Sequence, residues 1–214
     1  LMLVAIVTIL GAFNVVATVV TQRAAGTRLS DVRPFAFASL VTGGVIMLAS
    51  PVFLAGLLLL EFDQHFGGNL FASGADRVWT HMLWLNGRPE ALLVVLPALG
   101  AVVDIVSARV GTRPVGGRAA NALLGLYGAL TLLAWSVDSW ILAHVIQPNS
   151  TWQTSLVGVP TGLLLLLTLG TLAGGAKSLR PDGSLLFAVG TVLVIVLAVV
   201  NIIVAAVRGV TLPQ

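Results

Sequence analysis

The sequence has no cysteine and little charge. Without cysteine among its 214 residues, the chain forms no disulfide and offers no thiolate as a nucleophile or as a ligand for zinc or iron–sulfur clusters. Charged residues make up only 9% of the chain, against about 25% in a usual soluble domain. A soluble globular enzyme is therefore excluded. The hydrophobic fraction of 57% excludes an intrinsically disordered chain as well.

Long apolar runs dominate the chain instead. A membrane-spanning helix needs about 20 mostly apolar residues, and each of six stretches is that long without the period-2 pattern of a strand. They cover residues 1–21, 34–60, 79–107, 119–146, 152–173 and 184–207. We predict an all-α fold in which residues 1–214 form a single transmembrane domain, a bundle of six spanning helices.

The chain begins inside an apolar run at Leu1, with no basic segment before it. A secretory signal peptide starts with such a basic segment and ends at a small-residue cleavage site, and neither is present. Because position 1 is not an initiator methionine, we expect the sequence to be part of a longer protein, with Met2 as a true start the alternative.

Basic residues are concentrated in alternate loops. Loops 22–33, 108–118 and 174–183 share one side of the predicted bundle and hold Arg23, Arg28, Arg33, Arg109, Arg113, Arg118, Lys177 and Arg180. The opposite side holds only Arg77 and Arg208. Because basic loops stay in the cytoplasm, we expect these three loops to be cytoplasmic.

This asymmetry also explains the net charge of +3. The charge reflects the orientation of an integral protein in a lipid bilayer, which we expect to be a bacterial plasma membrane, and no nucleic-acid partner is expected. The longest loop, 61–78, is glycine-rich and mildly acidic. We expect it to form an ordered cap on the outer side.

Two opposite charges lie near the middle of the span 79–107. An ionisable residue at membrane depth costs about 2.5–3.5 kcal/mol on insertion scales, so Arg88 and Glu90 are functional candidates. Two residues apart, they face different sides of a regular helix, and Pro89 between them kinks it. We interpret Glu90 as a proton or water site, with a structural ion pair as the alternative. Asp104, near the inner end of this span, is expected to be a solvated flank.

Several motifs carry a family resemblance. The segment G-R-P-E-A-L (87–92), followed by V-V-L-P (94–97), resembles the G-H-P-E-V-Y…I-L-P segment of subunit I of the haem–copper oxidases. H-M-L-W (81–84) resembles the H-L-F-W before that motif, I-L-G-A-F-N (9–14) resembles the end of the family's fourth helix, and V-P-T-G (159–162) fits its eighth. The collinear order would make the six spans the family's helices four to nine, part of a larger cytochrome c oxidase subunit I-like bundle.

The departures from the family pattern concern its copper site. The resemblance places Arg88 where the family has a copper-binding histidine, and Trp135 and Ser136 near the positions of the other two. The family's tyrosine falls at Leu92, and the lysine of its second proton path falls at Leu164. Arginine offers no lone pair to a metal, so copper binding in the family manner is not expected. The family's haem ligands fall outside this chain, which leaves haem open for a longer parent protein.

Two family positions are kept. Glu90 matches the glutamate that gates proton delivery in many members, and Thr161 matches a polar residue of a second proton path. Asp138 lies three residues beyond Trp135, and in the family packing Arg88 would face that helix. We therefore predict an ion pair between Arg88 and Asp138 that replaces the charge of the lost metal.

The resemblance implies a divergent subunit I of a respiratory oxidase. Its family couples O₂ reduction to proton translocation, with other oxidase subunits and a cytochrome c or quinol donor as partners. Because the copper ligands are missing, we expect this version to be catalytically degenerate. Two alternatives stay open: a non-catalytic structural or assembly paralogue in a respiratory membrane complex, and an unrelated proton or ion transporter. The lack of an internal repeat weighs against the transporter.

Overall fold

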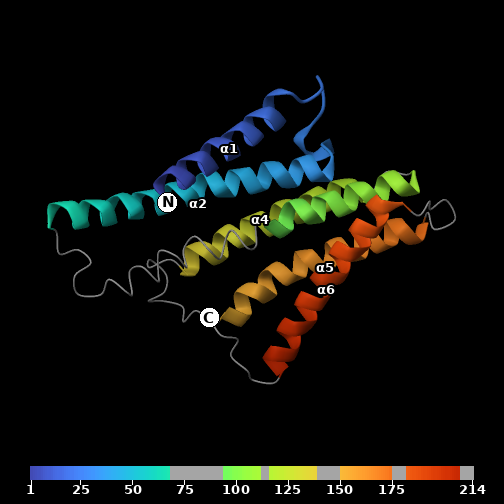
Figure 1. Ribbon diagram of the computed structural model, residues 1–214. Coiled ribbons are helices and arrows are strands. Elements are labelled where there is room, and N and C mark those ends of the chain that lie inside the picture. Colours follow the sequence, from blue (N-terminus) through green and yellow to red (C-terminus); the bar gives the residue numbers. More distant parts are fainter. Residues whose placement is uncertain (68–93, 112–115, 139–149, 175–181, 208–214) are drawn as a thin grey trace.

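The computed structural model describes residues 1–67, 94–111, 116–138, 150–174 and 182–207, and these residues form helices without any strand (Figure 1). The helices are α1 (Met2–Thr21), α2 (Pro34–Phe66), α4 (Gly117–Asp138), α5 (Ser150–Gly174) and α6 (Gly183–Val207). A short 3₁₀ helix, η1 (Leu29–Asp31), precedes α2, and an unlabelled helix covers 94–110. The predicted all-α membrane helix bundle is confirmed.

One predicted boundary is wrong. The span expected to end at residue 60 continues as α2 to Phe66, so the first six residues of the expected outer loop are helical. Contacts between side chains one turn apart stabilise this extra turn and a half. His65 Nδ1 lies 3.3 Å from Glu61 Oε1, and the stacked rings of Phe62 and Phe66 have their centroids 4.5 Å apart. The helix ends at Gly67, whose φ of 65° is a left-handed conformation that glycine adopts freely. Residues 79–93 and 139–146 of the expected spans lie outside the described parts of the chain.

The helices pack in chain order around a shared core. Helix α1 lies against α2, α2 against α4, α4 against α5, and α5 against α6 (Figure 1). The helix at 94–110 joins these layers through two apolar clusters. The first cluster combines α2, this helix, α4 and α5 through Ala38, Leu96, Leu99, Val103, Ala120, Leu124, Tyr127 and Leu164. The second joins Val102, Val106 and Val110 to Ala188 of α6.

Glycines let two helices approach α2 closely. A Cβ at Gly100 would lie 2.7 Å from Ala38 Cβ and 2.8 Å from the Pro34 carbonyl oxygen, and a Cβ at Gly128 would overlap Val41 Cγ1. Small residues at helix crossings are typical of membrane bundles, where close packing replaces the hydrophobic effect as the driving force. The core therefore depends on these two positions remaining glycine.

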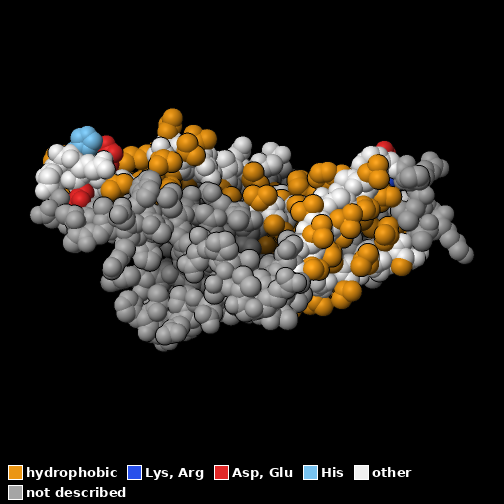
Figure 2. All heavy atoms as spheres, turned by 60° about the horizontal axis from the view of Figure 1, so that its bottom comes forward, with side chains coloured by type: hydrophobic (Ala, Val, Ile, Leu, Met, Phe, Trp, Pro, Cys, Tyr) orange, Lys and Arg blue, Asp and Glu red, His pale blue; other side chains and the backbone are white. Residues whose placement is uncertain are grey.

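The surface of the described helices is that of a membrane protein. Figure 2 shows hydrophobic side chains exposed along the helices, with the few charged side chains and the histidine near the two ends of the molecule. Within the described residues, α1 and α2 are each long and apolar enough to cross a bilayer. Six spans remain a prediction.

Candidate functional site

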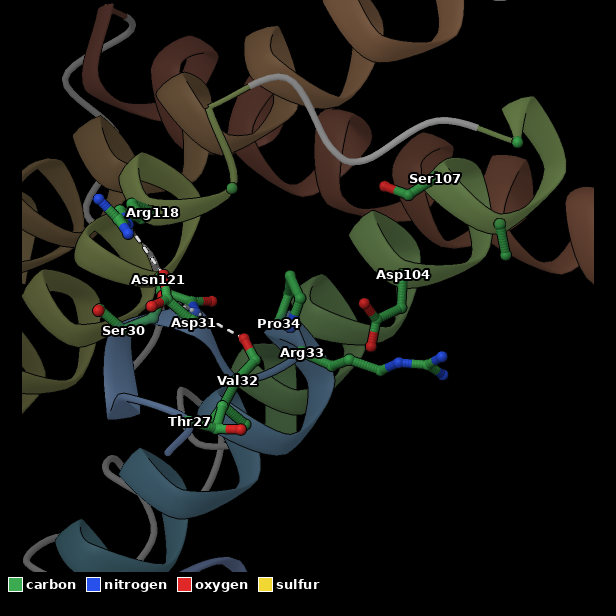
Figure 3. A pocket seen from close by; sticks show the side chains of 13 residues that line it. Thr27, Ser30, Asp31, Val32, Arg33, Pro34, Asp104, Ser107, Arg118 and Asn121 are labelled. Carbon is green, nitrogen blue, oxygen red and sulfur yellow. Dashed lines mark hydrogen bonds and ion pairs between the residues drawn. The ribbon is translucent and has the colours of Figure 1, made fainter. Parts of the chain in front are cut away.

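One group of polar side chains lies at the end of the bundle where α2 and α4 begin. The loop before α2, the last turn of the helix at 94–110 and the first turn of α4 enclose an open pocket of about 1040 Å³ (Figure 3). Its polar lining comes from Thr27, Ser30, Asp31, Arg33, Asp104, Ser107, Arg118 and Asn121. This end carries residues 22–33, 108–111 and 116–118, which belong to loops whose cytoplasmic placement is a prediction from the charge pattern.

Asn121 fixes the loop before α2 to α4. Its side chain is only 3% exposed, and its amide nitrogen donates to the carbonyl oxygens of Ser30 at 3.0 Å and Val32 at 2.8 Å. The Ser30 carbonyl belongs to η1 and the Val32 carbonyl directly follows it, so neither lies in an α-helix. The side chain therefore supplies hydrogen bonds that the backbone of the loop cannot make for itself.

An ion pair lies beside this clamp. Arg118 Nε lies 2.8 Å from Asp31 Oδ1, joining the first turn of α4 to η1 (Figure 3). The hydrogen bond from Arg118 to Asp31 and the charge of that carboxylate raise the pKa of the Arg118 guanidinium above its ordinary value. Because the arginine is largely exposed, this pair positions the loop more than it stabilises the fold.

Asp104 closes the other side of the pocket, where it is half-buried and does more than the solvated flank that the sequence predicts. Its carboxylate Oδ2 accepts a hydrogen bond of 3.1 Å from the backbone N–H of Phe35, in the first turn of α2. The first turn of a helix has backbone N–H groups without partners inside the helix, and a carboxylate there also interacts favourably with the helix dipole. Asp104 is thus a cap supplied to α2 by another helix.

A second ion pair ties α6 to the same end. Arg109 Nη2 lies 2.7 Å from Asp182 Oδ2, and Arg109 Nε donates to Ser184 Oγ at 2.9 Å. Asp182 directly precedes α6, where an acidic side chain favours the start of a helix. The charged end of the bundle is therefore connected across loops that are far apart in the sequence.

The described residues among those predicted to form the site lie away from this pocket, in the middle of α5 and in the last turn of α4. Thr161 is buried in α5, at 5% exposure, one turn before the fully buried Leu164. Trp135 and Ser136 belong to the last turn of α4, which ends at Asp138. Arg88 and Glu90 lie outside the described residues, so the predicted ion pair with Asp138 is not tested by the structure.

Sequence reasoning missed the clamp made by Asn121. A signal was present, because Arg118 and Asn121 are one helical turn apart at the start of a predicted span. A polar pair at that place can bind the loop of a neighbouring helix. The partner, however, is separated from Asn121 by 91 and 89 residues, at Ser30 and Val32. No local pattern reveals it.

Comparison with known proteins identifies the family. The model of the family "Cytochrome C and Quinol oxidase polypeptide I" matches residues 1–212. The chain belongs to this family. The inferred resemblance is confirmed, and the protein is a cytochrome c oxidase subunit I-like membrane protein.

Individual relatives agree with this assignment. The chain is 32% identical over 179 residues to a probable cytochrome c oxidase subunit 1-alpha of Streptomyces coelicolor, covering 80% of this chain and 30% of the relative. It is 30% identical over 193 residues to a probable subunit 1-beta of Nocardia farcinica, covering 89% and 32%. A cytochrome c oxidase subunit 1 of Bacillus sp. (strain PS3) is 30% identical over 174 residues, covering 79% and 28%. The chain thus spans about 30% of the length of these oxidase subunits.

Proposed function

We propose that this oxidase-like chain belongs to a subunit I that has lost its copper centre and no longer reduces O₂. The observation that carries the proposal is the identity of three residues. The motifs that resemble the family run through the chain in order, yet they put Arg88 at the position of one copper-binding histidine and Trp135 and Ser136 near the positions of the other two.

The chemistry of these three side chains does not fit copper. A copper centre of this type needs imidazole nitrogens with a free lone pair. The Arg88 guanidinium is permanently protonated, the Trp135 indole only donates, and the Ser136 hydroxyl is a poor substitute for an imidazole. Leu92 likewise provides no phenol where the family has its tyrosine. We therefore assign no reaction step to copper in this protein.

The two residues that match the family pattern, Glu90 and Thr161, are candidates for proton transfer rather than for O₂ reduction. Glu90 is a candidate for taking up and releasing a proton within the membrane, since burial favours the neutral form of a carboxylic acid. Thr161 is a second candidate, a hydroxyl that can donate and accept hydrogen bonds in the core of α5. One turn further along, the family's lysine is replaced by the fully buried Leu164. This interrupts the second path at that position.

The proposed loss of the copper ligands leads us to a structural role for the protein. A subunit that keeps the packing of the family without its copper ligands can still hold other subunits of a respiratory membrane complex. We propose this non-catalytic role ahead of electron transfer from a cytochrome c or quinol, although a longer parent protein could retain haem. Membership of the oxidase family argues against an unrelated transporter.

Oxygen uptake tests the proposed loss of catalysis. Membranes that contain the full-length protein as their only added oxidase should consume no O₂ above background when supplied with reduced cytochrome c or a reduced quinol. An active relative with all three histidines, expressed in the same membranes, is the positive control. Cyanide-sensitive uptake supported by this protein alone would contradict the proposal.

The proposed orientation has six spans, with loops 22–33, 108–118 and 174–183 in the cytoplasm. The test uses a cysteine-free background of the full-length protein and a membrane-impermeant maleimide. Gln64→Cys, exposed at the end of α2, should be labelled in intact cells, whereas Arg28→Cys should be labelled only after the cells are opened. The reverse pattern would overturn the orientation.

A further inference from the structure

Helix α1 lies at the edge of the described helices, with α2 as its neighbour (Figure 1). Ala5 and Ala12 lie on the side that packs against α2, and each is only 6% exposed. The crossing is close, because a Cβ at Gly43 of α2 would lie 2.8 Å from Val16 Cγ2 and 3.2 Å from the Ala12 carbonyl oxygen. One side of α1 is thus packed by α2, and the opposite side is open.

The open side of α1 carries an asparagine. Asn14 is two residues beyond Ala12, which places it about 200° around the helix, and it is exposed. Its side chain makes no hydrogen bond within the described part of the chain, whereas Thr8 and Thr21 of the same helix each donate to the backbone carbonyl four residues earlier. The Asn14 amide is therefore a hydrogen-bonding group without a partner on the face that points away from α2.

Asn14 also lies at membrane depth. Helix α1 has 20 residues, which at 1.5 Å per residue gives about 30 Å, the thickness of the hydrocarbon core of a bilayer. Asn14 precedes the end of the helix at Thr21 by seven residues, a distance of about 10 Å along the helix axis. Lipid tails offer no hydrogen bond to replace those that an amide makes in water. In membrane bundles such side chains are turned towards neighbouring helices.

A small residue and a second polar residue lie on the same face as Asn14. Gly11 precedes it by three residues and Thr18 follows it by four, the spacing of one helix face, and both are exposed. A Cβ at Gly11 would meet no other atom within 4 Å, so the described helices leave the space above this glycine free. A glycine lets a second helix approach closely, and an asparagine and a threonine can form hydrogen bonds to it. This face has the composition of a helix–helix contact rather than of a lipid-facing surface.

We propose that the face of α1 formed by Gly11, Asn14 and Thr18 packs in the intact protein against a further transmembrane helix of the same polypeptide, outside residues 1–214. The Asn14 amide forms a hydrogen bond with a polar group of that helix. The relatives favour this partner, because the chain spans only about 30% of their length and a full-length member of the family has chain enough for more spans. The inference rests on family membership and on the position of Asn14, and it does not depend on the proposed loss of copper.

Photocrosslinking in native membranes that contain the full-length protein identifies the neighbour of Asn14. With p-benzoylphenylalanine in place of Asn14, irradiation should form a crosslink to a peptide of the same polypeptide outside residues 1–214, which mass spectrometry of the digest identifies. Phe13 is the matched control, because it is 58% exposed and lies about 100° around the helix from Asn14. The same photoreactive residue there should give mainly lipid adducts, with a severalfold lower yield of protein crosslinks. Thr18 provides a second position on the proposed face if position 14 does not tolerate the change.

Five results would overturn the proposal. Lipid adducts alone at positions 14 and 18 would show that this face of α1 meets the bilayer. A crosslinked dimer on a denaturing gel would identify a second copy of the chain as the neighbour, and a crosslink to a different subunit would place the contact between proteins. A crosslinked peptide from within residues 1–214 would show that the chain covers this face itself. Equal yields of protein crosslinks at positions 13 and 14 would show that no particular face is covered. None of these outcomes depends on copper content or O₂ uptake, so this inference and the proposed function fail separately.

Discussion

Gly128→Ala should lower the free energy of unfolding of this protein by about 1–3 kcal/mol, the range for overpacking a well-packed core. The added Cβ would overlap Val41 Cγ1 at the crossing of α4 and α2. Removing that atom should relieve the overlap, so the double variant Gly128→Ala with Val41→Ala should recover part of the lost stability. Thermal or denaturant unfolding of the four members of this double-mutant cycle measures the coupling between the two positions.

Two further glycines sharpen this test. Gly44 lies in α2, and a Cβ added there would meet no other atom within 4 Å, so Gly44→Ala should change stability by less than about 0.5 kcal/mol or raise it slightly. At Gly100 the obstacle includes backbone, with the Pro34 carbonyl oxygen at 2.8 Å. Ala38→Gly should therefore fail to rescue Gly100→Ala. Additive effects of Gly128→Ala and Val41→Ala would contradict the close crossing.

Asp138→Asn should be the most damaging single change in the charged interior, with a loss of about 3–5 kcal/mol if it leaves Arg88 as an unpaired buried charge. The charge-swapped variant, Arg88→Asp with Asp138→Arg, should regain most of that stability because it restores opposite charges. Unfolding of the full-length protein in the same detergent, for each single variant and for the swap, measures the effect.

Asp182→Asn is the matched control for this experiment. Asp182 forms an ion pair with Arg109, but its side chain is 53% exposed. Surface pairs contribute about 0–1 kcal/mol, so this variant should be close to the native protein in stability. A swapped variant as unstable as the single variants would show that Arg88 and Asp138 are not partners.

The positions of the helices could be predicted from the sequence, because bilayer thickness sets a minimum length for each apolar run. Helices α1, α5 and α6 begin and end within two residues of the predicted spans. The prediction failed at the end of α2, where Glu61 and Asp63 suggested a loop. Charged residues favour a position outside the hydrocarbon core of the bilayer, but they do not by themselves end a helix. The helix continues until Gly67, where the backbone turns left-handed.

The polar pocket could not be predicted in the same way. Its contacts join Asp104 to Phe35 and Asn121 to Ser30, pairs separated by 69 and 91 residues. Periodicity assigns each residue to a helix face or a helix end, but it does not say which ends meet. The family motifs, by contrast, were recognisable from the sequence because their residue types and order are local.

The copper and haem content of the purified full-length protein tests the central claim most directly. Elemental analysis, together with a reduced-minus-oxidised optical spectrum, should find no copper at the oxygen-reducing position, because Arg88, Trp135 and Ser136 stand where three imidazoles are needed. Haem without copper, or neither, agrees with a subunit that has lost O₂ reduction. One copper per chain alongside haem would contradict the account and show that an active oxidase survives.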